Sequence, residues 1–255
     1  MARGPRLRSG VMLTLNHLVT SGTFSLDGGT WDVDNNVWVL GDDAECVVID
    51  APHDADAILA AVAPRRLTAI LCTHAHDDHI DAAAALAEAT HAPIWLHPAD
   101  RELWDQTYPD RAPDRDLTDG QTITVAGAEL TVLHTPGHSR GAVCFHVPGQ
   151  GWLFSGDTLF AGGPGATGRS FSDFGTIIDS IRDRLLVIDP DTIVHAGHGP
   201  DTTIGAERPH LRGDVDALVV SPRGIPDQVH LVTSLSNPVR GHPAAPGRGG
   251  WLRSA

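Results

Sequence analysis

Lysine is absent from this 255-residue sequence, and cysteine, aromatic residues and long apolar runs are scarce. All 18 basic residues are therefore arginine, and the formal net charge is −14 at pH 7. Because nucleic-acid binding needs clustered cations to meet the phosphates, this charge argues against a general nucleic-acid-binding function. No apolar run approaches the roughly 18 residues that a membrane-spanning helix requires, so we expect no membrane-embedded segment.

The cysteines are Cys46, Cys72 and Cys144. They are too few and too far apart for a disulfide scaffold, and we expect reduced, buried thiols. The N-terminal segment is basic and then briefly apolar, without the apolar core and the small-residue cleavage site of a signal peptide. We therefore expect a cytoplasmic protein. Strand-like sequence begins near Met12, which makes Met12 an alternative start.

The length fits one sizeable domain with short extensions at both ends. We expect residues 1–11 to form a flexible leader, residues 12–211 to fold as the domain, and residues 212–255 to be a poorly ordered tail. The last of these segments contains no glutamate and ends in sequence rich in proline, glycine and arginine. Such a composition has too little apolar pattern to build a core.

Hydrophobic periodicity predicts that strands and helices are interspersed along the domain. Residues 12–50 read as short strands separated by Asp-Gly-Gly and Gly-Asp-Asp turns. Further strands are expected at 66–74, 92–98, 121–125, 128–134, 142–147, 152–155 and 191–197, and helices at 55–63, 77–90, 99–108 and 174–188. Runs of strands with interspersed helices favour two packed sheets flanked by helices.

The segment from His74 to His79, "HAHDDH", concentrates ionisable groups between an apolar strand and an alanine-rich helix. His74 and His76 are two positions apart, so in an extended segment their side chains point to the same side. Asp78 and His79 follow in the first turn of the expected helix. Burying these groups without a cation would leave costly unpaired polar atoms, whereas imidazoles and carboxylates together suit zinc, iron or manganese.

A metal needs about four ligands, so further ligands should come from other strand ends. Three candidates lie beside glycine-containing turns where strands end. They are His138 in "HTPGHSRG", Asp157 in "FSGDTLF" and His198 in "VHAGHGP". Glycine at such turns lets the backbone approach a site closely.

Taken in chain order, His-X-His-X-Asp-His, Pro-Gly-His, Gly-Asp-Thr and Gly-His-Gly resemble the metallo-β-lactamase-fold hydrolases. Within that superfamily, "TPGHSRGAVCF", "FSGDTLF" and "GHGPDTTIG" are most similar to the glyoxalase II (hydroxyacylglutathione hydrolase) branch. The resemblance covers roughly residues 12–210. It implies an α/β (α+β) fold, a four-layer αββα sandwich with its site at one edge of the sheets.

The resemblance also implies two divalent metal ions, zinc first, with iron or manganese as alternatives. It assigns one metal to His74, His76 and His138, the second to Asp78, His79 and His198, and the bridge between them to Asp157. The implied reaction is hydrolysis of a small-molecule thioester by a hydroxide shared between the metals. Asp78 is the expected catalytic residue, because it is placed to orient that nucleophile.

The sequence departs from glyoxalase II in the residues that would recognise glutathione. Those enzymes use tyrosine, lysine and arginine side chains, whereas this chain has a single tyrosine, Tyr108, and no lysine. Phe145 stands where they commonly carry a tyrosine. For Arg169, in a glycine-rich loop after Asp157, contact with an anionic substrate and a structural role fit equally well. We therefore expect glutathione thioesters to be poor substrates, with another small thiol such as mycothiol as an alternative carrier.

Two other functions share this pattern of residues. A persulfide dioxygenase of the same fold would use one iron on the first three histidines, but the complete second ligand set favours hydrolysis. A lactonase or β-lactamase would share both metals and differ in its loops. The remaining motif histidines, His97, His134 and His195, lie outside the ligand positions, and we expect them to pack or to support ligands.

Overall fold

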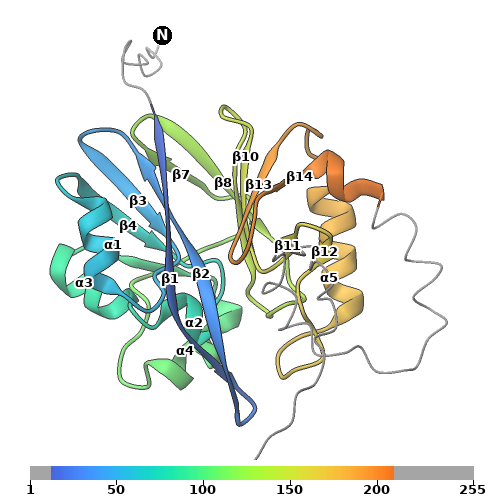
Figure 1. Ribbon diagram of the computed structural model, residues 1–255, viewed down its shortest axis with the longest axis horizontal. Helices are drawn as coiled ribbons and strands as arrows, with labels where there is room; N and C mark the ends of the chain where they lie inside the picture. The colour runs from blue at the N-terminus through green and yellow to red at the C-terminus, as the bar shows by residue number, and fades with distance from the viewer. Residues whose placement is uncertain (1–12, 210–255) are drawn as a thin grey trace, which may run out of the picture. The chain divides into compact units, whose positions relative to one another are not determined.

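The computed structural model describes residues 13–209, which form two six-stranded sheets and a small two-stranded ribbon (Figure 1). The leader expected at 1–11, the alternative start Met12 and the tail expected at 212–255 lie outside the described residues. The chain divides into two compact units, residues 1–224 and 225–255, and the second lies wholly outside the described part.

The first sheet has the strand order β1-β2-β3-β4-β5-β6. Its strands are β1 (Thr14–Leu26), β2 (Gly29–Gly41), β3 (Glu45–Ile49), β4 (Arg66–Leu71), β5 (Ile94–Leu96) and β6 (Arg115–Asp116). The first three strands pair antiparallel, and β3 to β6 pair parallel.

The second sheet has the order β14-β13-β10-β9-β8-β7. Its strands are β7 (Thr122–Val125), β8 (Ala128–His134), β9 (Val143–Val147), β10 (Trp152–Gly156), β13 (Ile193–Ala196) and β14 (Thr202–Thr203). Within it, β10 and β13 are parallel and the other neighbours are antiparallel. The ribbon consists of β11 (Leu159–Phe160) and β12 (Gly163–Pro164).

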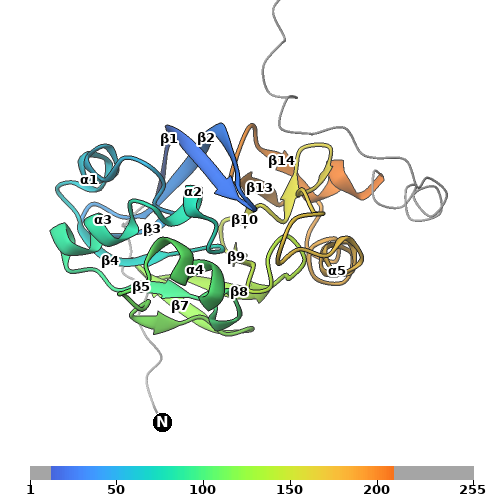
Figure 2. The same ribbon diagram turned by 90° about the horizontal axis from the view of Figure 1, so that it is seen from below.

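Helices cover the outer faces of both sheets, as Figures 1 and 2 show. They include α1 (Ala55–Val62), α2 (Asp77–Ile80), α3 (Ala83–Thr90), the 3-10 turn η1 (Pro98–Asp100), α4 (Arg101–Thr107), α5 (Phe174–Ser180) and the π-helical turn η2 (Ile181–Leu185). Asp54 and Asp173 cap α1 and α5, because their carboxylates accept hydrogen bonds from Ala57 N and Thr176 N. Among residues 13–209, no helix is long and apolar enough to cross a membrane.

Consecutive apolar residues of the central strands face opposite layers, which explains why those strands read as continuous apolar runs. On β3, Val48 packs with the helices of the first sheet, whereas Ile49 packs between the two sheets. On β10, Phe154 packs between the sheets and Leu153 packs toward α5. Three apolar interfaces therefore separate four layers, and the αββα sandwich expected from the sequence is confirmed. The cysteines are free and buried, as expected.

The single helix expected at 77–90 is wrong, because the chain forms α2 and α3 with a break at residues 81 and 82. The loop after β3 competes for the backbone there: Ala51 N donates to His79 O, and Ala82 N donates to Ala51 O. The Tyr108 hydroxyl lies 2.8 Å from Ile80 O and 2.7 Å from the next carbonyl, where it can donate a hydrogen bond. The break therefore makes α2 and α3 two separate helices.

Phe145 is fully buried in the interface between the two sheets. Truncation to alanine removes buried apolar surface and leaves a cavity, so Phe145→Ala should lower the free energy of unfolding by about 3–5 kcal/mol. Urea denaturation of the metal-free protein measures this. Val187→Ala, at a side chain that is 72% exposed, is the control and should change stability by less than about 0.5 kcal/mol. A similar small effect for both variants would contradict the packing role of Phe145.

Candidate metal centre

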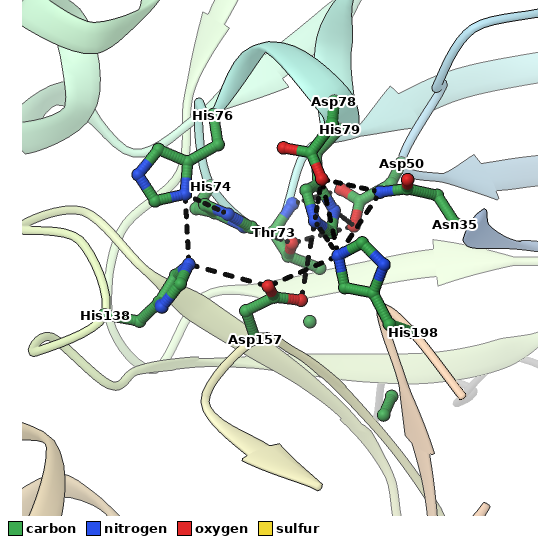
Figure 3. Close-up of polar contacts among 12 residues, drawn as sticks. Asn35, Asp50, Thr73, His74, His76, Asp78, His79, His138, Asp157 and His198 are labelled. Carbon is green, nitrogen blue, oxygen red and sulfur yellow. Dashed lines mark hydrogen bonds and ion pairs between the residues drawn. The ribbon is translucent and has the colours of Figure 1, made fainter. Parts of the chain in front are cut away.

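The residues proposed as ligands all lie at one edge of the sandwich, just beyond the ends of strands (Figure 3). The strands β8, β10 and β13 run in the same direction, so their C-terminal ends meet at the same edge. The ligands His138, Asp157 and His198 follow these strands, His74 and His76 follow β4, and Asp78 and His79 lie on α2. The structure thus brings together every ligand that the sequence suggested.

Three imidazoles form the first group, and each directs one nitrogen at a common point. His76 Nδ1 lies 3.0 Å from His74 Nε2 and 3.0 Å from His138 Nε2. The three ring planes are nearly perpendicular to one another, at 83–88°. All three side chains are buried. Converging ring nitrogens in a buried space are a donor set suited to a divalent cation.

The second group combines one carboxylate with two imidazoles. His79 Nε2 lies 3.2 Å from His198 Nε2. Asp78 Oδ2 lies 3.6 Å from His79 Nε2 and 3.4 Å from His198 Nε2. These three atoms can also hold a metal ion.

Asp157 lies between the two groups. Its carboxylate oxygens lie 3.5 Å from His138 Nε2 in the first group, and 3.4 Å from both His79 Nε2 and His198 Nε2 in the second. The side chain is only 11% exposed. This position lets one carboxylate serve two cations.

Hydrogen bonds to the outer ring nitrogens fix the tautomers of the histidines. His138 Nδ1 donates to Ala166 O and His198 Nδ1 donates to Asp34 O, each over 2.8 Å. Because a carbonyl can only accept, the proton of each neutral ring is on Nδ1 and the lone pair is on Nε2. The nitrogens that face the centre are therefore free to bind a metal.

Asp50 supports one ligand from each group, and sequence reasoning missed it. It accepts from His79 Nδ1 (2.9 Å), Thr73 N (2.7 Å) and Thr73 Oγ1 (2.8 Å). Since the Thr73 hydroxyl proton is used on Asp50, its oxygen accepts from His74 Nδ1, 3.0 Å away. His74 Nε2 thus also keeps its lone pair for the centre.

Asp100 is a second buried carboxylate that sequence reasoning missed. It accepts from Ala75 N (3.1 Å), Ser139 Oγ (2.6 Å) and Gly141 N (2.5 Å). These donors flank His74, His76 and His138, so Asp100 joins the two loops that carry the first group. Burial raises the pKa of Asp100, although its three donors oppose that shift.

The two groups differ in electrostatics. Burial, together with the neighbouring imidazole of His138, lowers the pKa of His76 to about 3, and burial lowers that of His74 well below its usual value. Burial also acts on His79 and His198, but the carboxylates of Asp78 and Asp157 outweigh it. The pKa of His79 is raised well above its usual value and that of His198 to about 10.

Buried polar atoms without partners indicate where cations fit. Among residues 13–209, Asp78 Oδ1 and Asp157 Oδ1 are shielded from solvent without a hydrogen-bond partner. Unpaired carboxylate oxygens in such a site carry a desolvation cost that a bound cation would offset. The donor set and these unpaired atoms both fit two divalent metal ions.

The other candidates from the sequence lie around the centre without joining it. The Arg169 guanidinium stacks on the Trp31 ring at 3.8 Å, on the β1–β2 hairpin whose Phe24 ring lies 5.0 Å from that of His76. This contact supports the structural role of Arg169. His97 and His134 stack on each other at 4.1 Å, and His195 packs against Trp38 and Phe154, so these three histidines have packing roles.

The pKa values predict that metal binding releases a different number of protons from each of the two groups. In the metal-free protein near pH 7, the raised pKa values keep His79 and His198 protonated, and a metal must displace those protons. The affinity of the second group should therefore rise with pH up to about 10, whereas His74 and His76 of the first group, with lowered pKa values, should release no proton near neutrality when a metal binds. Calorimetric zinc titration in buffers of different ionisation enthalpy measures both. Equal proton release in both binding steps would contradict this asymmetry.

Gly197 is required because the Asp157 carboxylate lies against it. A Cβ there would lie 2.4 Å from Asp157 Oδ1 and 2.7 Å from His79 Cε1. Gly197→Ala should therefore displace the Asp157 carboxylate and weaken metal binding by roughly 10–100-fold while the protein stays folded. Metal stoichiometry and far-ultraviolet circular dichroism check this. Gly149→Ala, where a Cβ meets open space, is the control, and equal metal content in the two variants would count against a role of Asp157 in metal binding.

Comparison with known proteins agrees with this geometry. The model of the metallo-beta-lactamase superfamily matches residues 30–198. The hydroxyacylglutathione hydrolase GloC of Haemophilus influenzae is 32% identical over 185 residues, covering 67% of this chain and 87% of that protein. The crystal structure of the B3 metallo-beta-lactamase BLEG-1 is 32% identical with a TM-score of 0.65, covering 75% of this chain and 97% of that one. TTHA1623 in a di-iron-bound form is 35% identical with a TM-score of 0.63, covering 69% and 93%. The chain belongs to the metallo-β-lactamase superfamily and is a metallo-hydrolase of that fold.

Proposed function

We propose that this metallo-hydrolase is dinuclear and cleaves a small-molecule thioester. The observation that carries the proposal is the position of Asp157, whose carboxylate lies within 3.5 Å of imidazoles from both groups. A mononuclear centre on the three histidines of the first group would leave Asp78, His79 and His198 without a cation, at an electrostatic cost. The relative named hydroxyacylglutathione hydrolase supports a thioester substrate, because hydroxyacylglutathione is a thioester.

Asp78 is the residue that we propose to orient the nucleophile. Two divalent cations, when bound, supply a water of lowered pKa and polarise the substrate carbonyl. Asp78 presents Oδ2 to His79 and His198, while its Oδ1 is buried without a hydrogen-bond donor in the described chain. Oδ1 can therefore accept a hydrogen bond from the attacking water and direct its lone pair at the carbonyl.

Zinc is the metal that we propose for this centre. Five imidazoles and two carboxylates form the donor set, without a thiolate, and this combination suits zinc. Iron and manganese remain the alternatives, and iron has support from the di-iron-bound form of the similar TTHA1623. Zinc and the two-metal stoichiometry are separate parts of the proposal, since either can hold without the other.

The thiol carrier is proposed to be a small thiol other than glutathione. The Tyr108 hydroxyl is engaged with backbone groups at the break between α2 and α3, and Phe145 lies between the sheets. Neither side chain is therefore free to contact a substrate, and the sequence offers no lysine. A cytoplasmic location and the absence of a nucleic-acid partner remain predictions from the sequence.

The protein loaded with zinc should hold close to two metal ions per chain and hydrolyse S-lactoyl thioesters without consuming oxygen. Metal analysis, a thioester assay and an oxygen electrode on one preparation measure all three quantities. Glutathione thioesters should react more slowly than those of another low-molecular-weight thiol such as mycothiol.

His76→Ala is the control, because it removes the nitrogen shared by both short contacts of the first group. This variant should lose metal from that group and essentially all hydrolysis while remaining folded. One iron per chain, with oxygen uptake on adding a persulfide, would contradict the hydrolase and indicate a persulfide dioxygenase. Turnover of lactones or β-lactams in preference to thioesters would keep the dinuclear centre and change the substrate class.

A further inference from the structure

Asn35, a fully buried residue of β2, contacts the second ligand group through Asp78 and His198 (Figure 3). Its Nδ2 donates to Asp78 Oδ2 over 3.1 Å. This is the same oxygen that lies 3.4 Å from His198 Nε2 and 3.6 Å from His79 Nε2. The amide thus holds the carboxylate oxygen that faces the second group, and limits rotation of the Asp78 carboxylate.

His53 holds Asn35 in turn. His53 Nε2 lies 3.0 Å from Asn35 Oδ1, and His53 Nδ1 lies 3.1 Å from Asp81 Oδ2. The backbone N of His53 also donates to Asp81 Oδ1 over 2.5 Å. The imidazole is only 5% exposed. Asp81, His53, Asn35 and Asp78 therefore form one continuous chain of polar contacts that runs inward from the surface.

The donor and acceptor roles in this series of polar contacts follow from the carboxylates at its two ends, Asp78 and Asp81. With the opposite amide orientation, Asn35 would place its carbonyl oxygen 3.1 Å from a carboxylate oxygen of Asp78, which is repulsive. The amide nitrogen therefore faces Asp78, and Asn35 Oδ1 accepts from His53. Both nitrogens of His53 then face oxygen atoms: Nε2 faces the Asn35 amide oxygen and Nδ1 faces the Asp81 carboxylate.

Two local features show that the position of His53 is constrained by its surroundings. Its backbone is in the left-handed region, at a φ of 59°, which is unfavourable for a histidine. The ring also lies against Gly22, where a Cβ would come within 2.2 Å of His53 Nδ1. A strained backbone conformation persists only where the surrounding structure fixes it. Such conformations are common at functional sites.

We propose that Asn35 and His53 are positioning residues that set the metal affinity of the second group. They act by holding Asp78 Oδ2 toward His79 and His198. The contacts of Asn35 reach the second group only, so the first group should be insensitive to them. The inference rests on the dinuclear centre of the proposed function, but it does not depend on the substrate.

A pair of substitutions at His53 separates this role from a structural one. In His53→Gln, the side-chain amide can place its nitrogen near the position of Nε2 and still donate to Asn35. In His53→Asn, the shorter amide corresponds to Nδ1 and can reach only Asp81. Asparagine tolerates the left-handed backbone much better than glutamine. A purely structural role therefore favours the asparagine variant, whereas the positioning role favours the glutamine variant.

The experiment is calorimetric zinc titration of the metal-free variants, with thermal unfolding of the same samples. Asn35→Ala and His53→Asn should weaken the second binding step by 10–100-fold and leave the first step unchanged. His53→Gln should stay close to the wild-type value. His97→Gln, at a half-buried histidine that stacks on His134, is the matched control and should change neither step. If Asn35→Ala does not fold, the His53 pair still decides the question.

Second-step affinity that is unchanged in His53→Asn, or that is lost equally in both His53 variants, would overturn the positioning role. Loss from both binding steps together would also overturn it, because that pattern indicates general destabilisation. A wild-type protein that binds only one zinc would instead contradict the dinuclear centre itself, and the inference with it. Thioester hydrolysis is not needed for any of these outcomes, so failure of the substrate proposal remains distinguishable.

Discussion

The crowding of imidazoles and carboxylates at one edge of the sandwich is the constraint on which the rest of this structure depends. The ring nitrogens of the first group, 3.0 Å apart, cannot all carry protons, and the carboxylates of Asp78 and Asp157 cannot stay charged and buried without cations nearby. The chain meets this constraint by fixing four of the five ligand rings from outside. Strand ends supply the backbone positions, and Asp50, the Thr73 hydroxyl and two backbone carbonyls hold those rings.

The ligands could be identified from the sequence because each belongs to a short local motif beside a strand end. Their supporting residues could not, because Asp50, Asp100 and Asn35 lie on other segments and reach the ligands only in the folded structure. An aspartate at the end of an apolar strand, such as Asp50 in "VVIDAP", is the one signal that sequence reasoning could have used. His53 carries no motif, and its role depends on Asn35 lying opposite it.

The layering was predictable for a related reason, since strands that are buried on both faces read as continuous apolar runs in the sequence. The break between α2 and α3 was not predictable, because alanine-rich sequence favours a continuous helix. Tertiary hydrogen bonds from Ala51 and Tyr108 override that propensity. The break makes α2, which carries Asp78 and His79 and contacts β1 and β2, a separate helix from α3, which contacts β4 and β5.

The two ligand groups depend on different parts of the fold. Asp100 joins the loops of the first group, whereas consecutive residues of β2 serve the second: Asp34 O accepts from His198 Nδ1, and Asn35 donates to Asp78. Asn36 Nδ2 lies within 3.0 Å of Ala196 O and Gly199 O, so it holds the loop that carries His198. Because Asp157 touches both groups and Asp50 supports one ligand of each, occupation of one group orders donors of the other. The affinities of the two metals should therefore be coupled through these two carboxylates rather than set independently.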